Sequence, residues 1–348
     1  MSISKSARVA VGGLELPRRR RGRLTPESEA EYQTRRTEFC RLILQIRSTM
    51  DFNVGSRGWC YILEQRGLIA KGDFDDAEKL ITDCRKAGDL PLDVCAEDNS
   101  REAVGLQGAL NDPDVESEAQ SWVDYLREDA HRNYTPFGFW DDLDVYVEVA
   151  VEKLDLRNLF APVRAEFFVP ITNFKGWSDL NSRAAMMRRF AEHEAAGRRC
   201  VLLLCGDHDP GGLLITGAMR RNLEDLAAAV DWSPLNLVIT RFGLNADFIR
   251  RHRLTWIDNL ETSSGKRLDD PDHNDHAKGF VQDYIRRYGV RKCEANALVV
   301  APAVGRDLCR RAILEHVPAG APEAYSDRLA IERKRLRVAI SQLMGGAS

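Results

Sequence analysis

The first half of the chain has the hydrophobic pattern of short helices. Apolar residues recur at helical spacing over residues 27–50, 56–66 and 74–87, with Ser56 at the N-cap position of the second stretch. Residues 90–96 follow as an extended piece. Three short helices followed by a strand-like wing are the pattern of a winged-helix (CAP-like) module. We therefore predict an α-rich winged-helix domain over residues 27–98.

From residue 144 onward, strands alternate with helices. Strands are expected at residues 145–151, 165–171, 200–205 and 235–240, and helices at residues 153–160, 179–196 and 212–230. Short connections between such elements indicate a mostly parallel, Rossmann-like sheet that is covered on both faces. We predict one α/β domain over residues 141–348, which ends in an amphipathic helix at residues 326–344.

Two segments fit neither pattern. Residues 1–26 lack periodicity and carry a run of arginines, so they are predicted to form a disordered basic arm, which is either solvated or in contact with phosphates. Residues 99–140 are polar and acidic, with one helix expected near residues 116–132. We interpret this second segment as a connector between the two domains.

Composition narrows the class of protein. The 348 residues carry a net charge of −3, which argues against a protein that coats nucleic acid through bulk charge but allows a local basic groove. No apolar run approaches the roughly 18 residues of a membrane helix, and no signal peptide precedes the domains, so a cytoplasmic protein is expected. The eight cysteines form no C-x-x-C pair, and we expect reduced thiols rather than structural zinc.

Acidic residues follow two of the predicted strands. Glu152 comes directly after residues 145–151, and Asp207 and Asp209 come directly after residues 200–205. Ligands gather at the carboxyl ends of strands in open parallel sheets. Carboxylates without histidine or cysteine favour Mg²⁺, which is suited to phosphodiester chemistry. The alternative is an aspartate-rich turn that caps the next helix.

Four segments carry a resemblance to a known superfamily. Val151-Glu152-Lys153 and Gly206-Asp207-His208-Asp209-Pro210-Gly211-Gly212 resemble the two motifs of a Toprim domain, in the forms found in the topoisomerase VI A subunit and the meiotic double-strand-break proteins. Lys292-Cys-Glu-Ala-Asn-Ala-Leu298 resembles a further motif of that superfamily. Ser56-Arg57-Gly-Trp-Cys-Tyr61 resembles the winged-helix segment that ends in the DNA-attacking tyrosine, with Cys60 in place of the first of its paired tyrosines.

The resemblance implies a Mg²⁺-dependent enzyme that cleaves double-stranded DNA. Glu152, Asp207 and Asp209 would be the metal ligands, Tyr61 the nucleophile and Arg57 a nearby partner of the phosphate or the tyrosine. A homodimer is expected because double-strand cleavage needs two active sites. A strand-passage cycle would need a separate ATPase partner because the chain has no P-loop.

Two alternatives to tyrosine transesterification stay open. Related bacterial Toprim proteins, including the nuclease subunit of Wadjet-type plasmid defence systems, cut DNA by hydrolysis, and Tyr61 would then be a core or interface residue. The chain could also be a non-catalytic DNA-binding subunit of a larger complex.

Several other polar residues are candidates for contacts at or near the acidic site. Glu148 either supports the acidic site or pairs with a buried arginine, and His208 either contacts phosphate or faces solvent. Arg241 is expected to contact DNA phosphates. Glu294 is expected to lie next to the metal ligands and support them without binding the metal itself. His273 and His276, among four aspartates, either bind a metal or belong to a loop that orders itself.

Overall fold

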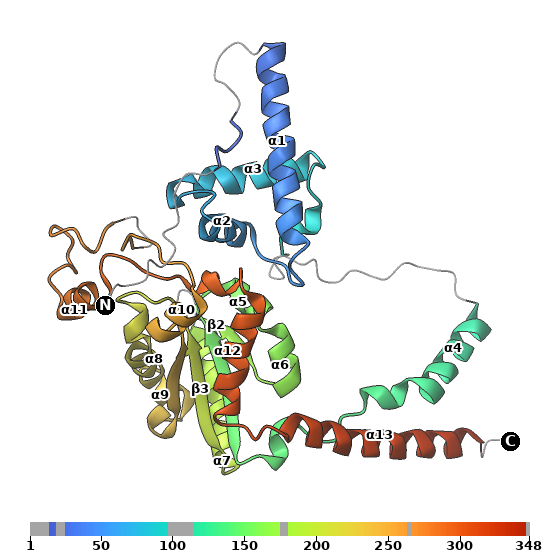
Figure 1. Ribbon diagram of the computed structural model, residues 1–348. Helices are drawn as coiled ribbons and strands as arrows, with labels where there is room; N and C mark the ends of the chain where they lie inside the picture. Colours follow the sequence, from blue (N-terminus) through green and yellow to red (C-terminus); the bar gives the residue numbers. More distant parts are fainter. Residues whose placement is uncertain (1–13, 19–24, 97–113, 175–179, 263–265, 346–348) are drawn as a thin grey trace.

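The chain is described by a computed structural model, which covers residues 14–18, 25–96, 114–174, 180–262 and 266–345 (Figure 1). It consists of a helical unit, a connector and a sheet unit, and one helix of the connector and the last helix of the chain extend to one side. None of the described helices combines the length and the apolar character that a membrane span requires.

The three predicted helices of the first half are present. They are α1 (Pro26–Arg47), α2 (Ser56–Gln65) and α3 (Phe74–Lys86). Helix α1 begins where it does because the Thr25 hydroxyl accepts a hydrogen bond from the Ser28 N–H at 3.2 Å, and a proline follows Thr25. The N-cap of α2 is Gly55 rather than the predicted Ser56. Buried apolar side chains hold the three helices together as the helical unit: Phe39, Ile43, Trp59, Leu63 and Ile81.

The predicted strand at residues 90–96 is wrong. This segment contains the 3₁₀ turn η2 (Leu92–Val94) instead. The Trp59 indole N–H donates to the Val94 carbonyl at 2.8 Å, and the Arg85 guanidinium donates to the Leu92 carbonyl. Because side chains of α2 and α3 donate hydrogen bonds to these carbonyls, the segment packs on the helices rather than pairing as a strand of a wing.

Most of the predicted basic arm, residues 1–13 and 19–24, lies outside the described residues. The piece between them contacts the helical unit. The Leu14 N–H donates to the Leu68 carbonyl at 2.8 Å, and the Leu16 side chain is buried. In the connector, α4 (Val115–Glu128) is shorter than the predicted helix and is followed by the 3₁₀ turns η4 (Ala130–Asn133) and η5 (Phe139–Asp142).

The sheet unit is built on four parallel strands, as an α/β fold requires. The strands are β1 (Val145–Val151), β2 (Ile171–Asn173), β3 (Arg199–Cys205) and β4 (Val238–Gly243), in the order β2-β1-β3-β4. Strands β1 and β3 pair over their whole length, from Val145 opposite Arg199 to Val151 opposite Cys205. Their carboxyl ends are therefore level, and the residues that follow them start from the same edge.

Helices cover both faces of the sheet (Figure 1). Helices α5 (Leu154–Leu159), α6 (Ala161–Phe167) and α12 (Pro302–Leu314) contact one another on one face. Helices α7 (Leu180–Ala195), α8 (Ile215–Glu224) and α9 (Ala227–Val230) lie on the other. The remaining elements are η6 (Gly212–Leu214), η7 (Pro234–Asn236), α10 (Ala246–His252), α11 (Gly279–Tyr288), η8 (Ala295–Leu298) and α13 (Ala321–Gly345).

Three predicted elements of this unit differ from the structure. The strand predicted at residues 165–171 is wrong, because α6 continues to Phe167 and β2 begins only at Ile171. A short apolar run does not distinguish a strand from a buried helix. The helix predicted at residues 212–230 is broken into η6, α8 and α9. The last strand is shifted to Val238–Gly243 because the preceding proline starts the turn η7.

The helical unit is docked on the sheet unit through polar contacts. The Gly55 N–H donates to Asp155 Oδ1 at 3.1 Å, and the Asn158 side chain donates to the Asn53 carbonyl at 2.9 Å. Arg306 of α12 makes a two-pronged ion pair with Asp51. These contacts place α2 beside the carboxyl edge of the sheet.

Candidate functional site

Glu152 and Asp207 lie where the order of the sheet reverses. The chain leaves β1 to build β2 on one side and then returns to build β3 on the other. Such a switch point opens a crevice at the carboxyl ends of the two central strands. The Glu152 N–H donates to the Cys205 carbonyl at 2.9 Å, which holds the two strand ends together. The two predicted acidic positions therefore meet at this edge.

Two glycines of the loop after β3 allow the backbone to pass close to the carboxylates. A Cβ atom on Gly206 would lie 2.7 Å from Glu152 Oε2, and one on Gly212 would lie 2.1 Å from the Asp207 carbonyl oxygen. Asp209 Oδ1 accepts a hydrogen bond from the Gly212 N–H at 2.6 Å, so this aspartate does cap the start of η6. The turn interpretation is thus correct for Asp209, and the charge of Glu152 nevertheless acts on its carboxyl group and raises its pKa.

Backbone amides and one ammonium group hold the carboxylates of Glu152 and Asp207. Glu152 Oε2 accepts from the Asp207 N–H at 2.8 Å, and Asp207 Oδ1 accepts from the Ala295 N–H at 2.7 Å. Lys153 Nζ lies 2.7 Å from Asp207 Oδ2 and 3.8 Å from Glu152 Oε1. Burial raises the pKa of Glu152, Asp207 and Asp209, and neighbouring carboxylates raise it further. Asp207 is buried and Glu152 and Asp209 are half-buried, so the three form a partly enclosed acidic cluster that one lysine only partly neutralises.

The donor set of Glu152, Asp207 and Asp209 fits a hard divalent cation. Carboxylates with raised pKa values favour a nearby positive charge, and oxygen-only donors are those that Mg²⁺ prefers. The three side chains do not bring one oxygen each within 4.8 Å of one another in this structure. Because Mg²⁺ usually keeps several waters, a wider set of protein donors remains suitable for it.

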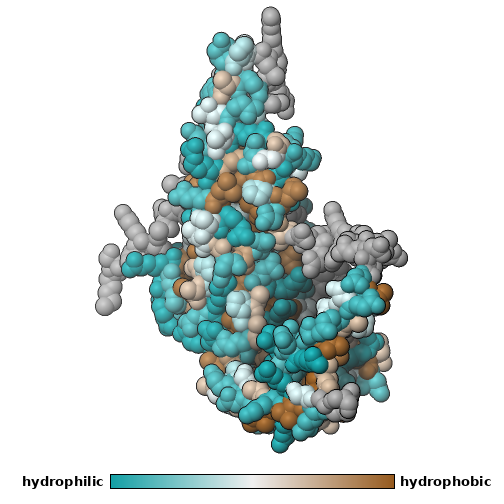
Figure 2. All heavy atoms as spheres, turned by 90° about the vertical axis from the view of Figure 1, so that its right-hand side faces the viewer, coloured by the Kyte–Doolittle hydropathy of each residue, from teal (hydrophilic) through white to brown (hydrophobic). Residues whose placement is uncertain are grey.

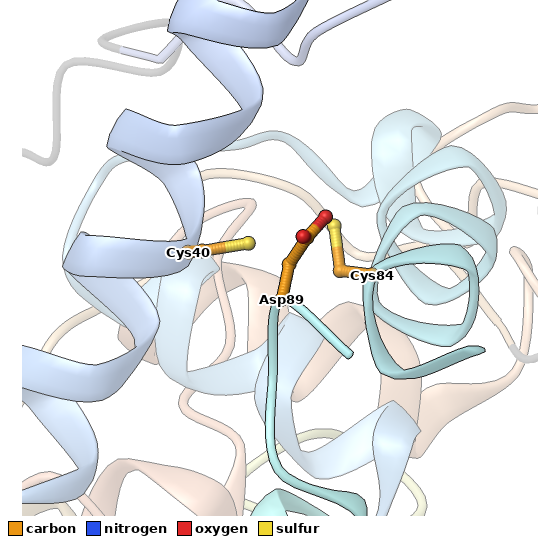
Figure 3. Close-up of side chains that lie close together, drawn as sticks. All are labelled: Cys40, Cys84 and Asp89. Carbon is orange, nitrogen blue, oxygen red and sulfur yellow. The ribbon is translucent and has the colours of Figure 1, made fainter. Parts of the chain in front are cut away.

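Among the described residues, one trio does have its potential ligand atoms within 4.8 Å of one another: Cys40, Cys84 and Asp89 (Figure 3). Cys40 comes from α1, Cys84 from α3 and Asp89 from the loop after α3. Arg36 Nη2 lies 2.6 Å from Asp89 Oδ2, and burial raises the pKa of the Cys40 thiol to about 12. With a neutral thiol and a carboxylate already paired, this trio packs α1 against α3 and is a poor metal site.

Tyr61 is brought to the acidic cluster by the docking of α2. Lys153 Nζ lies 5.6 Å from the centre of the Tyr61 ring, and the same ammonium group contacts Asp207. The ring is half-buried and packs edge-on against Phe74 with centroids 5.1 Å apart. Burial raises the pKa of the Tyr61 phenol and Glu294 raises it further, whereas Lys153 and Lys71 act in the opposite direction.

Arg57 contacts residues of α3 rather than the acidic site. Its guanidinium lies 3.2 Å from Asp75 and 3.1 Å from Glu78, and it stacks over the ring of Phe74 at 5.0 Å. The acidic start of α3 therefore neutralises this arginine. The cation next to the Tyr61 ring is Lys153.

Lys71 is a member of this region that the sequence did not indicate. Its ammonium nitrogen lies 2.9 Å from Glu294 Oε1, and Lys292 Nζ lies 3.1 Å from the same oxygen. Burial by itself would raise the pKa of Glu294, but Lys153, Lys292 and Lys71 together lower it to about 2. Lys71 belongs to the helical unit and lies 223 positions before Glu294, so no local pattern could have paired them.

The contact between α2 and η8 also buries polar groups that lack a protein partner. Both amide atoms of Gln65 and of Asn296 are in this state, as are Oε2 of Glu64 and Oε2 of Glu294. Burial, followed by the charge of Glu294, raises the pKa of Glu64 to about 7. Buried polar groups that no protein atom satisfies are commonly bridged by ordered water.

Both interpretations of His208 are wrong. The side chain is 1% exposed, its Nδ1 lies 3.0 Å from the Tyr284 hydroxyl, and Trp256 and Tyr288 pack around the ring. Burial lowers its pKa to about 4. The backbone of His208 pairs with Cys293, which places the Lys292–Leu298 segment beside the aspartate loop.

Other predicted residues have mostly supporting positions. Glu148 is fully buried and forms two 2.7 Å contacts with Arg189, so pairing with an arginine is correct, although that arginine is half-buried rather than buried. Arg241 donates to the Asp207 carbonyl at 2.9 Å and to Asn245, and therefore braces the aspartate loop. His276 Nδ1 lies 2.9 Å from the Leu268 carbonyl, in a loop that orders itself.

No protein-family model matches the chain, and no curated protein or solved structure shows significant similarity to it.

Proposed function

We propose that this chain is a Mg²⁺-dependent DNA-cleaving enzyme in which Tyr61 attacks the DNA backbone. In this proposal the helical unit is a winged-helix variant and the sheet unit is a Toprim domain. The observation that carries the proposal is the position of Tyr61, which shares Lys153 with Asp207 at the carboxyl edge of the sheet. A phenol, an ammonium group and buried carboxylates in one place are the groups that phosphoryl transfer needs.

The proposed reaction is a transesterification. The Tyr61 oxygen forms a bond to phosphorus while the bond from phosphorus to one bridging DNA oxygen breaks, and the phenol proton passes to the leaving oxygen. Lys153 stabilises the phenolate as it forms and orients Asp207. The phosphotyrosyl bond conserves the energy of the broken bond, so resealing stays possible.

Glu152, Asp207 and Asp209 would hold the Mg²⁺ ion. When bound, the ion supplies positive charge that offsets the charge on the phosphate oxygens in the transition state. The chain's own contribution is to hold these carboxylates in place with backbone amides.

Hydrolysis is the second candidate, and one observation favours it. The pKa of the Tyr61 phenol is raised above its ordinary value by burial, which makes this group a weaker nucleophile near neutral pH. In this case a water molecule attacks the phosphate, and Tyr61 serves to pack α2 against the site.

Incubation with supercoiled plasmid and Mg²⁺, followed by a detergent quench, tests the proposal. We expect DNA covalently attached to protein with the wild-type chain and none with Tyr61→Phe. Asp207→Asn should abolish cleavage of any kind. Asp225→Asn, an exposed aspartate on the far end of α8, is the matched control and should cleave normally.

Each other outcome has a definite meaning. Cleavage that survives Tyr61→Phe but not Asp207→Asn would replace transesterification with hydrolysis. DNA binding without cleavage, with or without a candidate ATPase partner, would overturn the enzymatic proposal and favour a non-catalytic DNA-binding subunit.

A further inference from the structure

Helix α13 has basic residues that are not paired with carboxylates. Five of its residues are basic and three are acidic. Two of the basic residues form ion pairs, since Arg328 contacts Asp142 and Arg335 contacts Glu332. In the part of the chain that the structure describes, the other three have no carboxylate partner: Arg333, Lys334 and Arg337. These three are three or four positions apart, so they lie on one face of the helix.

The three unpaired cations line a groove between α13 and the turn η4. The groove has a volume of about 340 Å³, and η4 contributes the side chains of Arg132 and His131 to it. Leu329 and Ala330 of α13 add apolar surface to the same groove, and no acidic side chain is among its lining residues. The groove therefore combines a strong positive charge with an apolar part.

This arrangement favours an anion as the occupant of the groove. Arg337 lies four positions after Arg333 and three after Lys334, and like charges at these spacings on a helix repel each other. The Arg333 Nε donates to the Tyr134 carbonyl at 3.1 Å, which holds this side chain in place. Its two terminal nitrogens make no hydrogen bond within the described residues. A guanidinium that is fixed in this way is well suited to bind phosphate.

Helix α4 limits the length of the anion. It contacts α13 and extends to the same side of the molecule (Figure 1). Figure 2 views this side, where hydrophilic residues surround separate apolar patches over the lower half. Helix α4 has four acidic residues and one arginine, so its net charge is −3. A nucleic-acid strand that continued beyond the groove would run close to this negative charge, whereas a compact anion would not.

We propose that this groove binds a nucleoside polyphosphate. The phosphates contact the three unpaired cations, and the base lies against Leu329 and the ring of His131. Sites for small molecules have volumes of roughly 300–1,000 Å³, and this groove lies within that range. The groove contains neither Tyr61 nor the acidic site, so the proposal does not depend on DNA cleavage.

Isothermal titration calorimetry of the full chain with ATP tests the proposal. EDTA is present, because Mg²⁺ would bridge ATP to the acidic site and would screen its phosphates. We expect ATP to bind and inorganic pyrophosphate to compete with it more weakly, since pyrophosphate has no base. Adenosine should not bind measurably, because it has no charge for the cations to attract.

Two cations of the groove and one outside it form a matched set of variants. Lys334→Ala and Arg337→Ala should each weaken the binding of ATP, and together they should weaken it more than about tenfold. Arg335→Ala is the control, because Arg335 is two positions from Arg333 and from Arg337 and lies on the opposite side of α13. It should bind ATP as the wild-type chain does. Alanine favours a helix at all three positions, and an unchanged far-UV circular dichroism spectrum shows that α13 is still formed.

Three results would contradict the proposal. A wild-type chain that does not bind ATP, or binding that the double variant leaves unchanged, would overturn it. A short oligodeoxythymidylate that binds more tightly than ATP and loses affinity in the same variants would make the groove a nucleic-acid contact instead. Pyrophosphate that binds as tightly as ATP would overturn the role of the base and leave inorganic polyphosphate as the ligand class.

Discussion

At the residue scale, the neighbours of a buried carboxyl group determine the direction of its pKa shift. Asp207 and Glu294 are both buried in the same region, and burial favours the neutral form of each. Asp207 has one lysine partner, and its pKa is raised. Glu294 has Lys71 and Lys292 within 3.1 Å, and its pKa is lowered. The sequence shows that both residues are carboxylic acids, but the pKa shift of each depends on contacts that form only on folding.

Glu64 leads to a prediction about pH. Its pKa is raised to about 7 in the folded protein, from an ordinary value of 4.5. Between these two values the folded state binds more protons than the unfolded state, so stability falls as pH rises from 4.5 to 7 and changes little from this cause above 7. At pH 8 the ionised Glu64 lowers the free energy of unfolding by about 3 kcal/mol. Glu64→Gln removes this loss and should therefore be more stable than the wild-type chain at pH 8.

Urea unfolding at pH 5, 6, 7 and 8 measures this effect, with the exposed Glu38→Gln of α1 as the control. The difference between Glu64→Gln and the wild-type chain should grow with pH, whereas the control should follow the wild-type curve. A Glu64→Gln variant whose stability changes with pH in parallel with the wild-type chain would contradict the assignment.

At the element scale, strands that are buried on both faces were the best predicted. All seven residues of β1 are buried, and its predicted bounds are correct. Strand β3 differs by one residue. The predicted strands at residues 90–96 and 165–171 were wrong. Both are short apolar segments, whose length does not distinguish a strand from a turn or a helix. Their conformation follows from packing against neighbouring helices.

The packing of α2 against the start of α5 depends on a glycine. A Cβ atom on Gly58 would lie 2.3 Å from Asp155 Oδ2, so an alanine there would displace the Asp155 carboxylate, which accepts from the Gly55 N–H, or shift α2 itself. Gly58→Ala should reduce the free energy of unfolding by roughly 1–3 kcal/mol, although alanine is the better helix former. It should also weaken the covalent attachment of Tyr61 to DNA that we propose.

Thermal and urea unfolding of Gly58→Ala measure the change in stability. Gly72→Ala is the matched control, because a Cβ atom there has no neighbour within 4 Å. If Gly58→Ala were as stable as the control variant, α2 would not be held as closely to Asp155 as the structure describes.

At the scale of the whole molecule, the site combines groups from the two units. Glu152, Lys153 and Asp207 belong to the sheet unit, whereas Tyr61 and Lys71 come from the helical unit. If the three carboxylates bind Mg²⁺, the ion stabilises the folded chain, because the unfolded chain has no such cluster.

Thermal unfolding with increasing MgCl₂, at constant ionic strength, checks this binding. At a Mg²⁺ concentration 100 times the dissociation constant, the stabilisation should be about 2.7 kcal/mol. Asp207→Asn should lose the Mg²⁺-dependent increase and the exposed Asp225→Asn should retain it. Equal increases in all three proteins would show that Mg²⁺ acts elsewhere.

The sequence by itself determined the parallel α/β sheet and the placement of Glu152, Asp207 and Asp209 at strand ends. Both follow from local patterns, since a buried strand and the loop after it are adjacent in the chain. Only the tertiary structure decided that Lys153 is the cation over the Tyr61 ring and that Lys71 pairs with Glu294, because both contacts form when the two units dock. It also decided that Arg57 is paired with the start of α3 and that His208 is buried. Contacts between residues far apart in the chain depend on how packed elements exclude water, and no local pattern records them.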